Sequence, residues 1–190
     1  MAVAIADVAG KGVPSALLMA RLYSSARYHL LTQPDVATAL SGLNTEIASS
    51  GLGHRFITCV LAVVDSVKNE LTLANAGHLP PLQRKVDGSV RAVGQADSGM
   101  PLGIVPSQSF KQTIYPIDPG DTWLLFTDGV TEAKRGDHEL YGGNRLMEYV
   151  SQGPQEANKL VKGVIQNVEE FCNGEPQADD TCLVCFRRDA

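Results

Sequence analysis

The chain has 190 residues, of which 44% are hydrophobic and 19% are charged, as is usual for one soluble globular domain with a full core. Its net charge of −5 disfavours a nucleic-acid partner, because such partners bind most readily to a basic face. No apolar run approaches the roughly 20 residues that a membrane span needs, which argues against a direct span.

Apolar spacing predicts the elements in chain order. A core strand opens the chain, and Pro14 stands where a first helical residue would, because the N–H that proline lacks has no helical partner there. A second helix starts at Pro34-Asp35 and ends at Gly51 and Gly53. Helices 14–31, 145–151 and 155–171 complete the helical set. The expected strands are 2–7, 56–65, 70–76, 82–86, 89–93, 110–117, 123–127 and 181–187, with a loop over 94–108.

This order groups the helices apart from the hairpins. It therefore favours an α+β layered sandwich over alternating βαβ units. Because Met1 leads directly into a core strand, we expect no secretory signal, and we expect the chain to be part of a longer protein.

Carboxylates stand at the ends of three of the expected strands, at Asp7, at Asp128 and at the pair Asp179 and Asp180. A carboxylate at the end of a buried strand is costly to desolvate unless it is paired or bound to a cation. Any single one of these residues is more often a helix cap or a turn residue. Together they predict an oxygen-rich site for a hard divalent ion, and hence metal-assisted hydrolysis at a phosphate.

The turn Gly10-Lys11-Gly12 invites comparison with a phosphate-binding loop. That motif needs a glycine five positions before its Gly-Lys pair and a serine or threonine after the lysine, where this chain has Ile5 and Gly12. The glycines instead predict a sharp turn from strand to helix, and the start of that helix still favours an anion. A phosphoaspartyl mechanism is also disfavoured, because Phe126 occupies the position of the nucleophile.

His78 and Arg55 are the other candidates for a role in chemistry. His78 can either ligate a metal or move protons, and the alternative is a structural histidine in a turn. Arg55 can clamp a phosphate, and the alternative is a solvated residue at the start of a strand. Cys182 and Cys185 have metal-ligand spacing but fall in a strand, where residues three apart face opposite sides, so we expect core packing in a reducing cytoplasm.

The segment from Asp7 to Leu17, Asp-Val-Ala-Gly-Lys-Gly-Val-Pro-Ser-Ala-Leu, resembles the metal-binding segment of the bacterial type 2C (PPM) serine/threonine phosphatases. The resemblance is to the branch of sporulation stage II E and sigma-factor-regulating phosphatases, and it covers essentially the whole chain. Further segments that follow the order of that family are 55–58, 75–81, 101–103, 119–121, 127–133 and 179–180.

The resemblance implies a four-layer αββα sandwich, with two antiparallel sheets between helix pairs and with the first strands of the fold missing. It implies two Mn²⁺ or Mg²⁺ ions, bridged by Asp7, with the Val8 carbonyl on one ion and with Asp128 and Asp179 on the other, beside Asp180. A hydroxide between the ions would attack phosphoserine or phosphothreonine in line. Residues near the substrate would be Gly10, Lys11 and Gly129.

In this branch the usual substrate is a phosphorylated anti-anti-sigma (STAS) domain, and its dephosphorylation sets a partner switch that frees a sigma factor. The resemblance therefore implies a cytoplasmic regulatory phosphatase spanning residues 1–190, with a sensor or receiver domain upstream. A homodimer is a further expectation.

The chain also departs from the family's pattern. The family has another acidic ligand in an upstream Gly-Gly-Asp segment, and nothing before Asp7 supplies it. Ala9 stands where eukaryotic relatives have a histidine, so no general acid is assigned, and His78 stands where they have an aspartate for a third metal. Cys182 replaces a threonine. Two alternatives stay open, a non-catalytic partner-binding module of the same fold and a two-metal hydrolase of a small phosphate ester.

Overall fold

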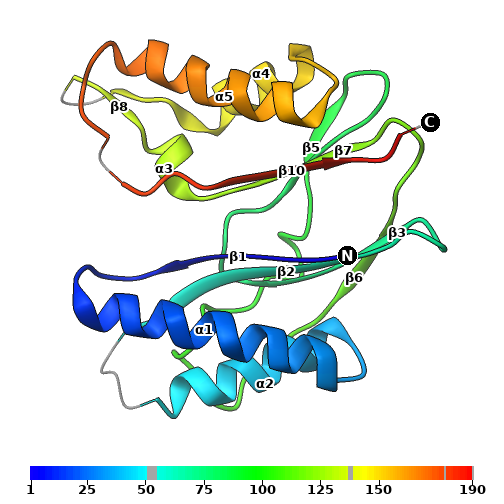
Figure 1. Cartoon of the computed structure of the whole chain (residues 1–190), viewed down its shortest axis with the longest axis vertical. Coiled ribbons are helices and arrows are strands. Elements are labelled where there is room, and N and C mark those ends of the chain that lie inside the picture. Colours follow the sequence, from blue (N-terminus) through cyan, green and yellow to red (C-terminus); the bar gives the residue numbers. More distant parts are fainter. Residues whose placement is uncertain (51–54, 137–138, 178, 190) are drawn as a thin grey trace. The chain divides into compact units, whose positions relative to one another are not determined.

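A computed structural model describes residues 1–50, 55–136, 139–177 and 179–189, and the chain divides into two compact units. Unit 1 comprises Met1–His78 and Gly94–Pro116, and unit 2 comprises Leu79–Val93 and Ile117–Ala190. Neither unit is a continuous segment, because the chain passes from one to the other three times. Each contains a four-stranded antiparallel sheet with a pair of long helices on it (Figure 1).

The sheet of unit 1 has the strand order β1-β2-β3-β6, and every neighbouring pair is antiparallel. β1 is an edge strand, and its register with β2 places Asp7 directly opposite Thr58. Opposite residues of an antiparallel pair share a face of the sheet, so the register fixes these two side chains as neighbours. The strands are β1 (Ala2–Val8), β2 (Ile57–Asp65), β3 (Glu70–Ala76) and β6 (Thr113–Pro116).

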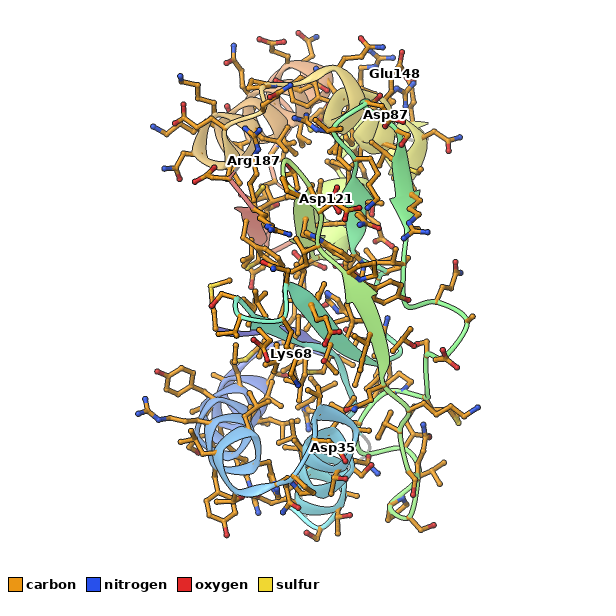
Figure 2. The ribbon with its side chains drawn as sticks, turned by 90° about the vertical axis from the view of Figure 1, so that its right-hand side faces the viewer. Asp35, Lys68, Asp87, Asp121, Glu148 and Arg187 are labelled. Atoms are coloured by element: carbon orange, nitrogen blue, oxygen red, sulfur yellow. The ribbon has the colours of Figure 1, made fainter. Side chains whose placement is uncertain are left out.

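Two helices, α1 (Val13–Thr32) and α2 (Val36–Ala48), pack on this sheet. α1 follows Gly12 and carries a proline in its first turn. α2 begins after Asp35, which Figure 2 labels and whose Oδ1 accepts a 2.7 Å hydrogen bond from the Thr38 N–H. This backbone hydrogen bond lowers the pKa of Asp35. The core is formed by apolar side chains from both helices and from the sheet, among them Leu18, Leu40, Leu43, Ile57 and Leu61.

One carboxylate, Glu46 on α2, links the two helices of unit 1. Its oxygens accept a 2.6 Å hydrogen bond from Ser25 and lie 3.4 Å from Arg21 Nε and 3.3 Å from His29 Nε2. The helices approach closely because α2 has Gly42, where a Cβ atom would lie 2.6 Å from the His29 ring. The Ser25 hydroxyl, followed by Arg21 and His29, holds the pKa of Glu46 below its ordinary value.

The sheet of unit 2 has the order β10-β7-β4-β5 and is also antiparallel. Its helices pack through apolar side chains, including Leu146, Val150, Leu160 and Val164, which are almost fully buried. At the turn before β7, Asp121 Oδ2 accepts hydrogen bonds from Gln83 (2.9 Å) and Lys85 (2.8 Å), and Figure 2 labels this buried aspartate. The elements are β4 (Leu82–Arg84), β5 (Val90–Ala92), β7 (Thr122–Phe126), β10 (Leu183–Arg187), α3 (Asp128–Thr131), α4 (Gly142–Gln152) and α5 (Ala157–Cys172), with a hairpin of β8 (Lys134–Arg135) and β9 (Glu139–Leu140).

The α+β class with antiparallel sheets is confirmed, and most elements lie within a few residues of their expected ranges. The strand expected over 110–117 is wrong at its start, because Phe110 packs in the core while its N–H donates to Ser41 Oγ, and pairing with β3 begins only at Thr113. The strands expected over 82–86 and 89–93 are also too long where they approach each other. A turn occupies 85–89, so β4 ends at Arg84 and β5 begins at Val90. The predicted helix end at Gly51 and Gly53 lies outside the described residues.

Three short elements, α3, β8 and β9, were not expected from the sequence, and α4 begins three residues earlier than predicted. The loop over 94–108 is confirmed as lacking a named helix or strand in the described part of the chain. In the parts of the chain that the structure describes, no helix has both the length and the apolar character to cross a bilayer.

Candidate functional site

In unit 1, Asp7 lies within β1, one residue before the strand ends. The side chain opposite it, Thr58, shares a 2.8 Å hydrogen bond between its Oγ1 and Nδ1 of His78. Backbone pairing along the whole of β1 and β2 fixes the position of Asp7. The sheet therefore presents a carboxylate, a hydroxyl and an imidazole as one polar group at the end of an otherwise apolar strand pair.

His78 is held from both sides by a second buried residue, Asn75. The His78 N–H donates to Asn75 Oδ1 (2.8 Å), and Asn75 Nδ2 donates to the His78 carbonyl (3.0 Å). Both residues are buried, with exposures of 2% for Asn75 and 7% for His78. This reciprocal pair gives His78 a structural role in the turn, and it also orients the ring toward Thr58.

Arg55, which precedes β2, lies beside Gly10 in the turn between β1 and α1. This is the position that a phosphate-clamping role would require. Gly10 and Gly12 both have positive φ angles, 101° and 89°, so the turn requires glycine at both positions. A Cβ atom on Gly10 would lie 3.6 Å from Arg55 Nε and 3.5 Å from Ser15 Oγ. Ser15 Oγ is buried and has no hydrogen-bond partner among the described residues. The exposed Lys11 lies in the same turn, so basic groups and an uncommitted hydroxyl gather at the start of α1.

In unit 2, Asp128 is the first residue of α3, and Thr127 alone separates it from the end of β7 at Phe126. The next residue, Gly129, packs against the segment that carries the other two acids, because a Cβ atom there would lie only 2.4 Å from the Asp180 carbonyl oxygen and 3.2 Å from that of Asp179. Any larger residue would push the two segments apart. Glycine at this position therefore allows the Asp128 turn and the Asp179-Asp180 turn to meet.

Thr127 joins these two turns by hydrogen bonds. Its Oγ1 donates to the Asp180 carbonyl (3.0 Å) and accepts from the Cys182 N–H (2.9 Å), and its own N–H donates to the Cys182 carbonyl (3.1 Å). Gln177 supports the same turn, with its Nε2 2.7 Å from the Asp179 carbonyl. Neither Thr127 nor Gln177 was expected to have a role, and the only indication for Thr127 in the sequence is its place before Asp128-Gly129.

The structure thus brings Asp128, Gly129, Asp179 and Asp180 together within unit 2. In unit 1 it places Asp7 opposite Thr58, whose side chain contacts His78, and it places Arg55 beside Gly10. Val8 is buried at the end of β1, beside Asp7. Across the described residues, no group of three or more histidine, cysteine, aspartate or glutamate side chains is gathered closely enough to hold a metal ion.

The chemistry of the donor set nevertheless suits a hard divalent cation, because it consists of carboxylate and carbonyl oxygens. The Asp128 carboxylate is half-buried, and among the described residues no protein group is paired with it. A partly desolvated carboxylate in that state is one that a cation would stabilise.

The expectation that Cys182 and Cys185 both pack in the core is wrong for Cys182. That residue lies before β10 and is exposed, whereas Cys185 lies in the strand and packs against the core of unit 2. Both are free thiols, and burial raises the pKa of Cys185 to about 11.

Comparison with known proteins places the chain in a family. The model of stage II sporulation protein E (SpoIIE) matches residues 1–189. The phosphoserine phosphatase RsbU of Bacillus subtilis is 30% identical over 193 residues, which cover 98% of this chain and 55% of RsbU, so the chain spans little more than half of that relative.

Solved structures agree on the fold. The PP2C domain of SiaA from Pseudomonas aeruginosa superposes with a TM-score of 0.82 at 23% identity, covering 99% of this chain and 75% of that one. The PP2C domain of SpoIIE from Bacillus subtilis does so with a TM-score of 0.82 at 16% identity, covering 99% of this chain and 54% of that one. The resemblance found in the sequence is therefore confirmed, and the chain belongs to the SpoIIE family of PP2C-type phosphatase domains.

Proposed function

We propose that this chain is a metal-dependent protein phosphatase domain that hydrolyses phosphoserine or phosphothreonine on a regulatory protein. The observation that carries the proposal is the close packing of Asp128-Gly129 on the Asp179-Asp180 turn, in a chain of this family. RsbU, the relative described above, is a phosphoserine phosphatase, which supports the same chemistry here.

Two Mn²⁺ or Mg²⁺ ions are the proposed cofactors, with Asp7, the Val8 carbonyl, Asp128, Asp179 and Asp180 as the residues that would hold them. RsbX, whose fold is similar (TM-score 0.68, 15% identity), was solved in complex with magnesium, which supports a divalent ion. A bound divalent ion supplies a more acidic water and neutralises charge on the phosphoryl oxygens.

The remaining residues of the proposed site bind and orient the phosphoryl group. Arg55 and Lys11 supply positive charge beside the turn at Gly10, where the buried Ser15 hydroxyl adds a further donor. Gly129 lets the Asp128 turn pack on the Asp179-Asp180 turn. His78 is oriented by Asn75 and Thr58, and we propose that it positions groups around Asp7 rather than acting as the general acid.

We propose a phosphorylated STAS domain as the substrate, because the sequence resembles the branch that regulates sigma factors. A cytoplasmic location, a sensor or receiver domain upstream and a homodimer are parts of the same proposal. Nucleic acid has no place in it, which is consistent with the net charge of −5.

The test is a titration of Mn²⁺ into the purified chain, followed by calorimetry and by hydrolysis of p-nitrophenyl phosphate and of a serine-phosphorylated STAS domain. The variant Asp128→Asn should lose turnover by at least about 100-fold, because even residues that only support a metal ligand cost 10–100-fold when changed. Its fold should survive, because among the described residues the carboxylate has no protein partner to lose.

Asp189→Asn, an exposed aspartate beyond β10, is the matched control and should keep full activity. Full activity in Asp128→Asn would overturn the assignment of the site. Saturable metal binding without turnover would instead favour the non-catalytic partner-binding module.

A further inference from the structure

Unit 2 contains a cavity of about 330 Å³ between α3 and the second half of α5. Its apolar lining comes from three elements, with Val130 on α3, Ile165, Val168 and Cys172 on one face of α5, and Leu183 on β10. Val130 is fully buried, and Val168, Cys172 and Leu183 pack against the core of the unit. The cavity therefore has a firm apolar floor, while Ile165, which is 40% exposed, brings its lining out to solvent.

The cavity borders both turns that carry the proposed metal ligands of unit 2. Gly129 and Thr181 line it, and they are the residues directly after Asp128 and Asp180. Gln177 lines it as well, with its Nε2 2.7 Å from the Asp179 carbonyl and 3.4 Å from Thr181 Oγ1. A group in the cavity would therefore lie against the residues that directly follow Asp128 and Asp180 in the chain.

Size and charge indicate what kind of group fits. Ligand pockets run from roughly 300 to 1,000 Å³, so this cavity suits a single large side chain better than a nucleotide-sized cofactor. Three charged residues line it, Lys134, Glu169 and Glu175. The acids outnumber the base, so the charge favours a basic residue beside the apolar group.

We propose that this cavity receives a large apolar side chain of the phosphoprotein substrate, close in sequence to the phosphorylated residue and followed or preceded by a basic residue that faces Glu169 and Glu175. The proposal rests on the proposed function, because it places the phosphoryl group at the carboxylates next to the cavity. An apolar anchor in a preformed pocket is the kind of contact that dominates the affinity of an interface.

The experiment compares two substrates in the Mn²⁺-loaded protein. A serine-phosphorylated STAS domain carries neighbouring side chains, whereas p-nitrophenyl phosphate carries none. Ile165→Arg puts a charge at the mouth of the cavity, and the side chain is exposed enough for the fold to tolerate it. We expect kcat/KM for the phosphoprotein to fall about 10-fold or more, mainly through KM, while turnover of p-nitrophenyl phosphate stays within about twofold.

Gln166→Arg is the matched control, because it adds the same charge to the next residue of α5, which is exposed and outside the lining. It should leave both substrates unaffected. Replacing the apolar residues near the phosphoserine of the STAS domain by alanine should reproduce the loss in the unaltered phosphatase and add little to Ile165→Arg, because coupled residues give non-additive effects.

The outcomes separate the two proposals. If p-nitrophenyl phosphate is hydrolysed normally but Ile165→Arg and Gln166→Arg act alike on the phosphoprotein, the cavity does not receive the substrate and the proposed function stands. An equal loss on both substrates would mean that Ile165 serves only the fold, which also overturns the inference. A failure of the unaltered protein to hydrolyse p-nitrophenyl phosphate with Mn²⁺ would remove the proposed function, and this subsite with it.

Discussion

The two units share a plan, a four-stranded antiparallel sheet with a helix pair on an apolar core, but unit 1 adds a polar link between its helices. In unit 1 the helices meet around one carboxylate, Glu46, which contacts Ser25, Arg21 and His29. In unit 2 the helices meet through apolar side chains such as Val150 and Val164. Similar architecture therefore does not imply a similar response to pH, because an ionised group joins α1 to α2 in unit 1.

The proposed site residues differ in the same way. Asp7 is part of a strand whose residues all pair with β2, so backbone hydrogen bonds fix its position. Asp179 and Asp180 precede their strand, and side chains of Thr127 and Gln177 hold their turn. The part of the site in unit 2 should thus be the more sensitive to substitutions of its supporting residues. Gly129→Ala and Thr127→Val test this expectation, and Glu46→Gln tests the polar link between the helices of unit 1.

The largest effect is expected for Gly129→Ala. The added Cβ would lie 2.4 Å from a backbone oxygen of Asp180, which no flexible side chain can relieve, so one turn must shift. We expect the free energy of unfolding to fall by about 2–3 kcal/mol, as for other overpacked sites, and Mn²⁺ binding to weaken. Urea unfolding and calorimetry measure the two effects.

Gly143→Ala provides the control, because a Cβ at that position in α4 meets no atom within 4 Å. It should cost nothing and can gain up to about 1 kcal/mol, because alanine favours a helix. Equal stability of the Gly129 and Gly143 variants would show that the two turns do not depend on close packing.

A smaller loss, about 2 kcal/mol, is expected for Thr127→Val. The change keeps the shape of the side chain but leaves the Cys182 N–H and the Asp180 carbonyl without their hydroxyl partner. Hydrogen exchange should speed up at the Cys182 amide, and Mn²⁺ affinity should fall. Thr127→Ser retains the hydroxyl and should restore most of both, whereas a serine variant as impaired as valine would assign the effect to the methyl group instead.

The smallest effect is expected for Glu46→Gln in unit 1, and it should depend on pH. The Ser25 hydroxyl, and then Arg21 and His29, lower the pKa of Glu46 below its ordinary value of 4.5. A carboxyl whose pKa is lowered by folding adds stability above its unfolded pKa and loses it as pH falls through the folded pKa. The variant should therefore be less stable by about 1 kcal/mol at neutral pH, and this deficit should shrink below pH 4.5.

Urea unfolding at neutral pH and at about pH 3.5 measures this difference, and Glu148→Gln, an exposed carboxylate on α4 that Figure 2 labels, is the control. A deficit for Glu46→Gln that is the same at both pH values would show that the ionised carboxylate does not hold the α1–α2 pair.

The sequence predicted the long elements because their patterns are local. Alternation located β3, and helical spacing located α1 and α5 to within two residues. Phe110 misled the prediction of β6 because an apolar residue beside a strand can belong to the core without belonging to the ladder. The four-residue helix α3 has too few residues to show any period, so no pattern could have indicated it.

The candidate site was predictable in its residue types and less so in its supports. Asp128 and Asp179 could be chosen because acids at strand ends are unusual and match a family pattern. The hydrogen bond from Thr127 to Asp180 joins residues 53 positions apart, and no local pattern encodes such a partner. The same holds for the link between Thr58 and His78, because it depends on how β2 and the turn after β3 meet.

The interleaving of the two units has a consequence for synthesis on the ribosome. Unit 1 cannot be completed until β6 has been made, and by then the β4–β5 hairpin of unit 2 has already emerged. That hairpin must wait, with its apolar face uncovered, for β7 and α4 to be translated. A nascent chain of this protein therefore passes through a stage in which β4 lacks its partner β7, and a rare codon or pause between residues 93 and 122 would lengthen that stage.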